Sequence, residues 1–80
     1  MQKNYVMLNN HDLISLIENH LEKINIEYQS LHNRVEIYHL DRGLIVVEIN
    51  QNSFSISYNK NNHEFEKIDL FFKKLDELLI

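Results

Sequence analysis

The 80-residue sequence contains no cysteine, no proline and no tryptophan, and it has a single glycine. The lack of cysteine excludes disulfides and thiolate metal sites, and one glycine is too few for a glycine-rich phosphate-binding loop. No apolar run approaches the roughly 18 residues of a membrane-spanning helix, and the first ten residues lack the layout of a signal peptide. We therefore expect one soluble, cytoplasmic domain that spans residues 1–80.

Basic residues are also scarce, with eight against twelve acidic ones and a formal net charge of −4. Lys73 and Lys74 are the only adjacent basic pair. Proteins that bind nucleic acid usually carry a basic patch, so neither direct nucleic-acid binding nor a membrane contact is expected. An acidic protein is better suited to a protein partner with a basic surface.

Catalytic and metal-binding patterns are missing as well. Two of the five histidines, His11 and His20, lie nine residues apart on a predicted helix, and no histidine pair has the spacing of zinc ligands. Ser53, Ser55 and Ser57 alternate along a strand without an adjacent general base. The sequence thus predicts a protein that is not an enzyme and has no cofactor or metal, with His39 in a structural role near a hairpin end.

Helical spacing of apolar residues predicts two amphipathic helices, over residues 10–25 and 62–79. Asn9 or Asn10 is expected to cap the first helix and Asn25 to end it in a left-handed conformation. Asn61 followed by Glu64 resembles a capping box for the second. The two apolar stripes contain Leu13, Ile14, Ile17, Leu21 and Ile24, and then Phe65, Ile68, Phe71, Phe72, Leu75, Leu78 and Leu79.

Three strands are predicted between these helices, at Val35–Leu40, Leu44–Asn50 and Ser53–Tyr58, with a short extended piece at Ile26–Tyr28 in the connector. The linkers "DRG" and "QN" have hairpin lengths. The expected fold is α+β, with a three-stranded antiparallel meander and both helices packed on one face in the order αβββα.

Burial fixes the expected register of the two hairpins, because directly opposed residues share a face of the sheet. A two-residue loop at 51–52 places Ile49 opposite Phe54, Val47 opposite Ile56 and Ile45 opposite Tyr58. A three-residue loop at 41–43, with Gly43 in the left-handed position, pairs Ile37 with Val47 and Val35 with Ile49.

The other face of this sheet is then not simply polar. It carries an apolar strip of Tyr38, Leu40, Leu44 and Val46, bounded by Glu36, Glu48 and Ser57. A rimmed apolar patch often marks a contact site; the occupant is a partner, a second copy of the chain, or residues 4–8 folded back. Glu36 and Glu48 are expected to oppose each other, either neutralised by Arg34 or holding a basic side chain of a partner.

The helix–three strands–helix order is also that of double-stranded RNA-binding domains. Those domains place a basic cluster at the start of their last helix to bind phosphates. The corresponding stretch here, "NNHEFEKID", is acidic. This topology therefore does not predict RNA binding.

The stretch "HDLISLIEN", residues 11–19, is close to a helix of the form "NDLIxxIxN" in small acidic phage proteins. On this helix and the element order, the chain resembles anti-CRISPR inhibitors of type II nucleases. In that family, acidic side chains around the sheet loops imitate DNA phosphates and block a basic groove. The resemblance assigns this role to Asp41, Glu48, Glu64 and Glu66, the last two placed before and within the second helix.

Our leading hypothesis is a small non-enzymatic binding protein, encoded by a phage or a mobile element, that covers a basic surface of a nucleic-acid enzyme, such as a CRISPR nuclease, and inhibits it in the host cytoplasm. The alternatives are a homodimeric interaction module and an antitoxin or immunity protein that neutralises a basic toxin. The expected partner-binding residues are Glu36, Tyr38, Leu40, Asp41, Leu44, Val46, Glu48, Glu64 and Glu66.

Overall fold

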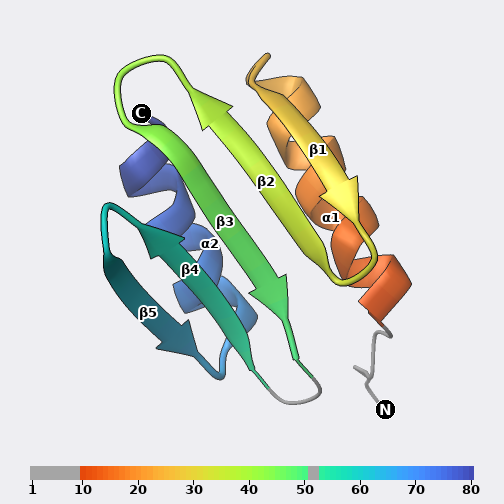
Figure 1. Ribbon diagram of the computed structural model, residues 1–80. Coiled ribbons are helices and arrows are strands. Elements are labelled where there is room, and N and C mark those ends of the chain that lie inside the picture. The colour runs from red at the N-terminus through yellow and green to blue at the C-terminus, as the bar shows by residue number, and fades with distance from the viewer. Residues whose placement is uncertain (1–9, 51–52) are drawn as a thin grey trace, which may run out of the picture.

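A two-layer α+β fold is seen in the computed structural model, which describes residues 10–50 and 53–80 (Figure 1). The sheet is antiparallel with the strand order β1-β2-β3-β4-β5, and both helices cover the same face. This confirms the α+β class and the shared helix face, but the sheet has five strands instead of three. The elements are α1 (Asn10–Lys23), β1 (Glu27–Leu31), β2 (Arg34–His39), β3 (Gly43–Ile49), β4 (Phe54–Tyr58), β5 (Asn61–Phe65) and α2 (Ile68–Leu79).

The core lies between the sheet and the two helices. Alternate residues of the three central strands point into it, as the period-two pattern of a half-buried strand requires. Phe71 is fully buried at its centre and contacts the rings of Phe54, Phe65 and Phe72. The buried apolar residues are Ile14, Ile17, Leu21, Val35, Ile37, Ile45, Val47, Ile49, Ile56, Phe71, Leu75, Leu78 and Leu79.

The segment predicted as a connector after the first helix is a full strand, β1. It pairs with β2 across a two-residue turn in which His32 has a φ of 52°. Polar contacts hold it to α1: the Tyr28 hydroxyl donates to Glu22 at 2.6 Å, and Ser30 contacts Glu18. The hydrogen bond to Glu22 raises the pKa of Tyr28 to about 12. The strand has no alternating apolar pattern in its sequence, "EYQSL", because the side chains that contact α1 include polar ones.

The second helix begins at Ile68, six residues later than predicted, because Asn61–Phe65 forms β5. Asn59 and Lys60 have φ values of 52° and 68°, which define a tight two-residue hairpin turn. The predicted capping box is therefore wrong, since Asn61 pairs with Tyr58 and Lys67 occupies the N-cap position without a side-chain hydrogen bond.

The first helix matches its prediction more closely, although it ends at Lys23. Asn25 has a φ of 61°, which confirms the left-handed stop. Ile24 lies beyond the helix and is 37% exposed, so its assignment to the core stripe is wrong. The predicted cap concerns Asn9 and the Asn10 side chain, which lie outside the described part of the chain.

One hairpin register is as predicted and the other is shifted. The pairs Ile49–Phe54, Val47–Ile56 and Ile45–Tyr58 are confirmed, although loop residues 51–52 themselves lie outside the described residues. The β2–β3 hairpin instead pairs Ile37 with Ile45, Val35 with Val47 and His39 with Gly43. Gly43 has the expected left-handed φ, 80°. A shift of two residues keeps every side chain on its face, so the apolar pattern does not distinguish the two registers.

We expect Lys60→Gly to stabilise the protein by about 0.5–1 kcal/mol, because glycine adopts a positive φ without the steric cost that lysine has. Chemical denaturation of the variant and the wild type measures the difference. Lys73→Gly, at an exposed position inside α2, is a matched control that should destabilise by about 1 kcal/mol. A loss of stability in Lys60→Gly would contradict the tight turn between β4 and β5.

Candidate functional site

The sheet face opposite the two helices is the candidate site, and we call it the outer face. It faces the viewer in Figure 1, with both helices behind the sheet. Strand pairing defines its members, because opposed residues point to the same side. They are Glu27, Gln29, Leu31, Arg34, Glu36, Tyr38, Leu44, Val46, Glu48, Ser55, Ser57, Asn62 and Glu64.

An apolar strip of Tyr38, Leu44 and Val46 lies on the outer face. Tyr38 is directly opposite Leu44, and they are 42% and 49% exposed. Val46 is half-buried between Glu36 and Ser57. The predicted strip also contained Leu40, but this residue lies in the β2–β3 loop, where it is fully exposed. The strip is therefore shorter than predicted.

Carboxylates surround this strip. Glu27, Glu36, Glu48 and Glu64 come from four different strands, whereas Arg34 is the one lysine or arginine among the described outer-face residues. The face is therefore acidic. Because proteins attract partners of complementary potential, such a face favours a basic surface.

The predicted opposition of Glu36 and Glu48 is wrong. The observed register places Glu36 opposite Val46 and Glu48 opposite Arg34. A guanidinium nitrogen of Arg34 lies 3.4 Å from Glu36, and the Arg34 Nε is buried without a hydrogen-bond partner. Arg34 thus pairs with Glu36, and it lies opposite Glu48 on the neighbouring strand.

The structure places the predicted binding residues in three locations. Glu64 is on β5 and Glu66 is in the bend before α2, so neither belongs to the second helix. Asp41 and Leu40 are in the β2–β3 loop. The outer face collects the other predicted residues, Glu36, Tyr38, Leu44, Val46 and Glu48, together with Glu64.

Sequence reasoning missed Glu27 and Gln29, which reach the outer face from β1. The alternation of Tyr28 and Ser30 toward α1, followed by the polar His32-Asn33 turn, was the available signal.

The Tyr38 hydroxyl lies among acceptors on the outer face. It is 3.3 Å from Glu36 Oε1 and 3.4 Å from Gln29 Oε1. Partial desolvation raises the pKa of Tyr38 above its usual value, and the hydrogen bond to Glu36 and the charges of Glu36 and Glu27 raise it further. The neutral phenol is therefore the form that this acidic face favours.

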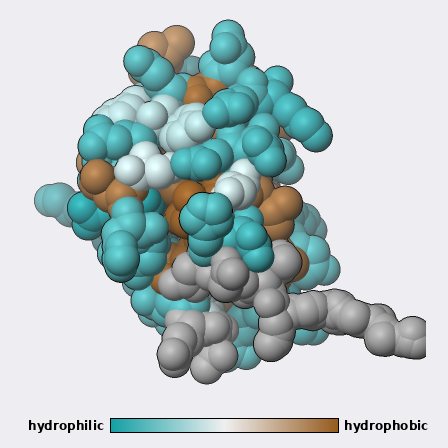
Figure 2. Space-filling model, turned by 90° about the vertical axis from the view of Figure 1, so that its right-hand side faces the viewer, coloured by the Kyte–Doolittle hydropathy of each residue, from teal (hydrophilic) through white to brown (hydrophobic). Residues whose placement is uncertain are grey.

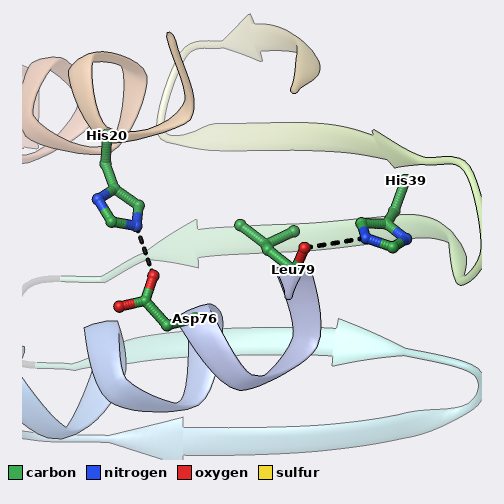
Figure 3. A network of polar contacts seen from close by, with 4 residues as sticks. All are labelled: His20, His39, Asp76 and Leu79. Atoms are coloured by element: carbon green, nitrogen blue, oxygen red, sulfur yellow. Dashed lines mark hydrogen bonds and ion pairs between the residues drawn. The ribbon is translucent and has the colours of Figure 1, made fainter. Parts of the chain in front are cut away.

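The loop that adjoins the outer face is fixed to the end of α2. His39 Nε2 lies 3.1 Å from the Leu79 carbonyl oxygen (Figure 3), while its Nδ1 is 3.1 Å from the backbone nitrogens of both Asp41 and Arg42. Arg42 donates from Nε to the Leu78 carbonyl at 2.5 Å. These contacts place cationic and N–H groups on the free carbonyls of the helix end. They also confirm the structural role expected for His39.

A second histidine joins the two helices. His20 Nε2 on α1 lies 2.6 Å from Asp76 Oδ1 on α2 (Figure 3). The His20 ring also meets Phe72 edge-on, with 5.4 Å between the ring centroids. Both histidines of Figure 3 therefore use their nitrogens to hold secondary-structure elements together. They join α1 to α2 and the end of β2 to the end of α2.

Comparisons with protein-family models, with curated proteins and with solved structures found no match to this chain. No group of three or more His, Cys, Asp or Glu side chains is placed to hold a metal ion within residues 10–50 and 53–80. Among those same residues, no helix has both the length and the apolar character needed to cross a bilayer.

We expect Glu36→Gln to lower the pKa of Tyr38, because it removes both a charge and a charged hydrogen-bond acceptor. Since the folded pKa lies above the unfolded value, Tyr38 stabilises the wild type below pH 10, and this contribution falls as the pH rises through the folded pKa. Titration of the Tyr38 ring signals by NMR measures the shift. An unchanged Tyr38 titration in Glu36→Gln, with Glu77→Gln as the control, would contradict this contact.

Proposed function

We propose that this protein is a non-enzymatic binding protein whose outer face covers a basic surface of a protein partner. The single observation that carries the proposal is the apolar strip of exposed Tyr38 and Leu44 and half-buried Val46, within a group of four carboxylates. An apolar centre with a charged rim is the usual anatomy of a protein interface. The strip supplies buried area, and the carboxylates supply attraction and orientation.

The partner that fits this charge is an enzyme that acts on nucleic acid. Such enzymes need basic surfaces to bind phosphates, and an acidic protein that occupies one competes with the substrate. The formal net charge of −4 favours this encounter. The resemblance to anti-CRISPR inhibitors, which with five strands in the sheet rests on the stretch "HDLISLIEN" alone, points to the same class and makes a CRISPR nuclease the first partner to test, in the cytoplasm of an infected cell.

A homodimer through the same face is the weaker candidate. A symmetric dimer places one surface against its own copy, so Glu36 and Glu48 would approach the carboxylates of the second chain. The third predicted occupant of the strip is residues 4–8, and these lie outside the residues that the structure describes. An antitoxin would use the same acidic face, and the identity of the partner separates it from an enzyme inhibitor.

The test is capture on the tagged protein from nuclease-treated host lysate, followed by an activity assay of the recovered enzyme. We expect recovery of a nucleic-acid enzyme, its release by salt, and inhibition of its activity by the purified protein. The Val46→Lys variant should neither capture nor inhibit. Capture of such an enzyme without inhibition, or equal capture by Val46→Lys, would overturn the proposal.

A further inference from the structure

A cavity of about 400 Å³ opens next to the outer face, at the upper end of the molecule in Figure 1. Three segments meet there: the turn between α1 and β1, the β2–β3 hairpin and the C-terminal end of α2. Tyr38 belongs both to the cavity lining and to the apolar strip. The cavity is therefore continuous with the proposed binding surface.

The cavity lining has both apolar and polar members. The apolar ones come from all three segments and are Ile24, Ile26, Leu40 and Leu79. Ile24 is 37% exposed and Leu40 is fully exposed. Hydrophobic atoms protrude at this upper end in Figure 2, which views the molecule from the side of α1 and β1. Exposed large apolar side chains that converge on one hollow are typical of an anchor site.

The charges at the cavity are of one sign. Glu27 and Asp41 both line it, and no lysine or arginine does so among the described residues. His39 also lines it, and the form that satisfies its contacts is neutral: Nδ1 accepts from two backbone N–H groups while Nε2–H donates to Leu79. The site therefore offers an apolar hollow with two carboxylates.

We infer that this cavity receives a bulky apolar side chain of the partner, flanked by an arginine or lysine that pairs with Glu27 and Asp41. The inference rests on the proposed function and adds the chemistry of the partner's anchor. A side chain that fills a desolvated pocket supplies much of the affinity of an interface, and the neighbouring ion pairs fix its orientation.

A second hollow of similar size provides an internal control. It measures about 410 Å³ and lies between the helices, where Leu16, His20, Lys23 and Phe72 line it. Leu16 is 42% exposed, much as Ile24 is. This hollow has a lysine and no carboxylate in its lining, so it does not attract a basic ligand.

The experiment is an NMR titration of the isotope-labelled full chain with the peptide Ac-Arg-Trp-Arg-NH2, and with Ac-Glu-Trp-Glu-NH2 as the matched acidic probe. We expect the basic peptide to shift the amide signals of residues 24–27 and 38–41, with a dissociation constant at least about tenfold below that of the acidic peptide. Equal affinity for both peptides, shifts centred on Leu16 and Phe72, or no shifts at about 5 mM peptide would each overturn the inference.

Two variants locate the binding. Leu40→Ser should weaken binding of the basic peptide about tenfold, because it removes an apolar side chain from the cavity lining without changing the charge, whereas Leu16→Ser should leave its affinity unchanged. Both side chains are exposed, so the fold tolerates the changes, and the amide spectrum verifies it. If Leu40→Ser still captures the cellular partner as well as the wild type while Val46→Lys does not, the cavity inference fails and the proposed function stands.

Discussion

Phe71→Ala is expected to destabilise the protein by about 3–5 kcal/mol, the usual cost of removing a buried aromatic ring from a core. Phe71 is fully buried, and its ring centroid lies 5.1 Å from those of both Phe54 and Phe72. Its removal leaves a cavity where β4, β5 and α2 meet. An 80-residue domain has a total stability of roughly 4–12 kcal/mol, so the variant should be largely unfolded at elevated temperature.

Denaturant unfolding followed by circular dichroism measures this loss. Leu70→Ala is the control, because Leu70 is the neighbouring residue on α2 but is 51% exposed, and its replacement should change stability by at most about 0.5 kcal/mol. Phe71→Leu should fall between the two. Similar losses for Phe71→Ala and Leu70→Ala would contradict the placement of α2 on the sheet.

The second large effect concerns binding. The double variant Leu44→Lys with Val46→Lys should weaken partner binding by at least about 100-fold, because it places two positive charges in the apolar strip that faces a basic surface. Stability should change little, since Leu44 is 49% exposed and both side chains lie outside the core. Calorimetry or surface plasmon resonance with the captured partner measures the loss.

Charge-reversal variants test separately whether the carboxylates of the outer face contribute to partner binding. Glu36→Lys and Glu48→Lys should each weaken binding about tenfold at low salt and less at high salt, because salt screens exposed charges. Glu77→Lys reverses an exposed carboxylate on α2, away from the outer face, and should have no comparable effect. Equal losses for all three reversals would indicate general charge repulsion instead of a defined surface.

Much of the fold followed from apolar periodicity, and the two missed strands have one physical cause. Ile56 lies between Ser55 and Ser57, which predicts its face of the strand. Pairing then assigns Val47, opposite Ile56, to the same helix-facing side. β1 and β5 were not, because these edge strands carry many polar residues and their strand character depends on pairing with a neighbour. Phe65, the last residue of β5, lies three residues before Ile68. This is also the spacing of one face of a helix, so the apolar pattern placed Phe65 in the second helix.

The candidate site was predictable in outline but not in register. Tyr38, Leu44 and Val46 were placed on the outer face because one hairpin register buries the correct side of each strand. The two-residue shift that separates Glu36 from Glu48 depends on the loop, where the His39 side chain binds the backbone of Asp41 and Arg42. Such a side-chain contact leaves no periodic signal in the sequence.

The most direct test of the central claim, that the outer face is the binding surface, is amide hydrogen–deuterium exchange of the protein alone and with its captured partner. We expect slowed exchange to be concentrated in β2 and β3, from Glu36 to Val46, while the exposed sides of α1 and α2 exchange as in the free protein. Protection confined to the helices, with the strands of the outer face unaffected, would contradict it.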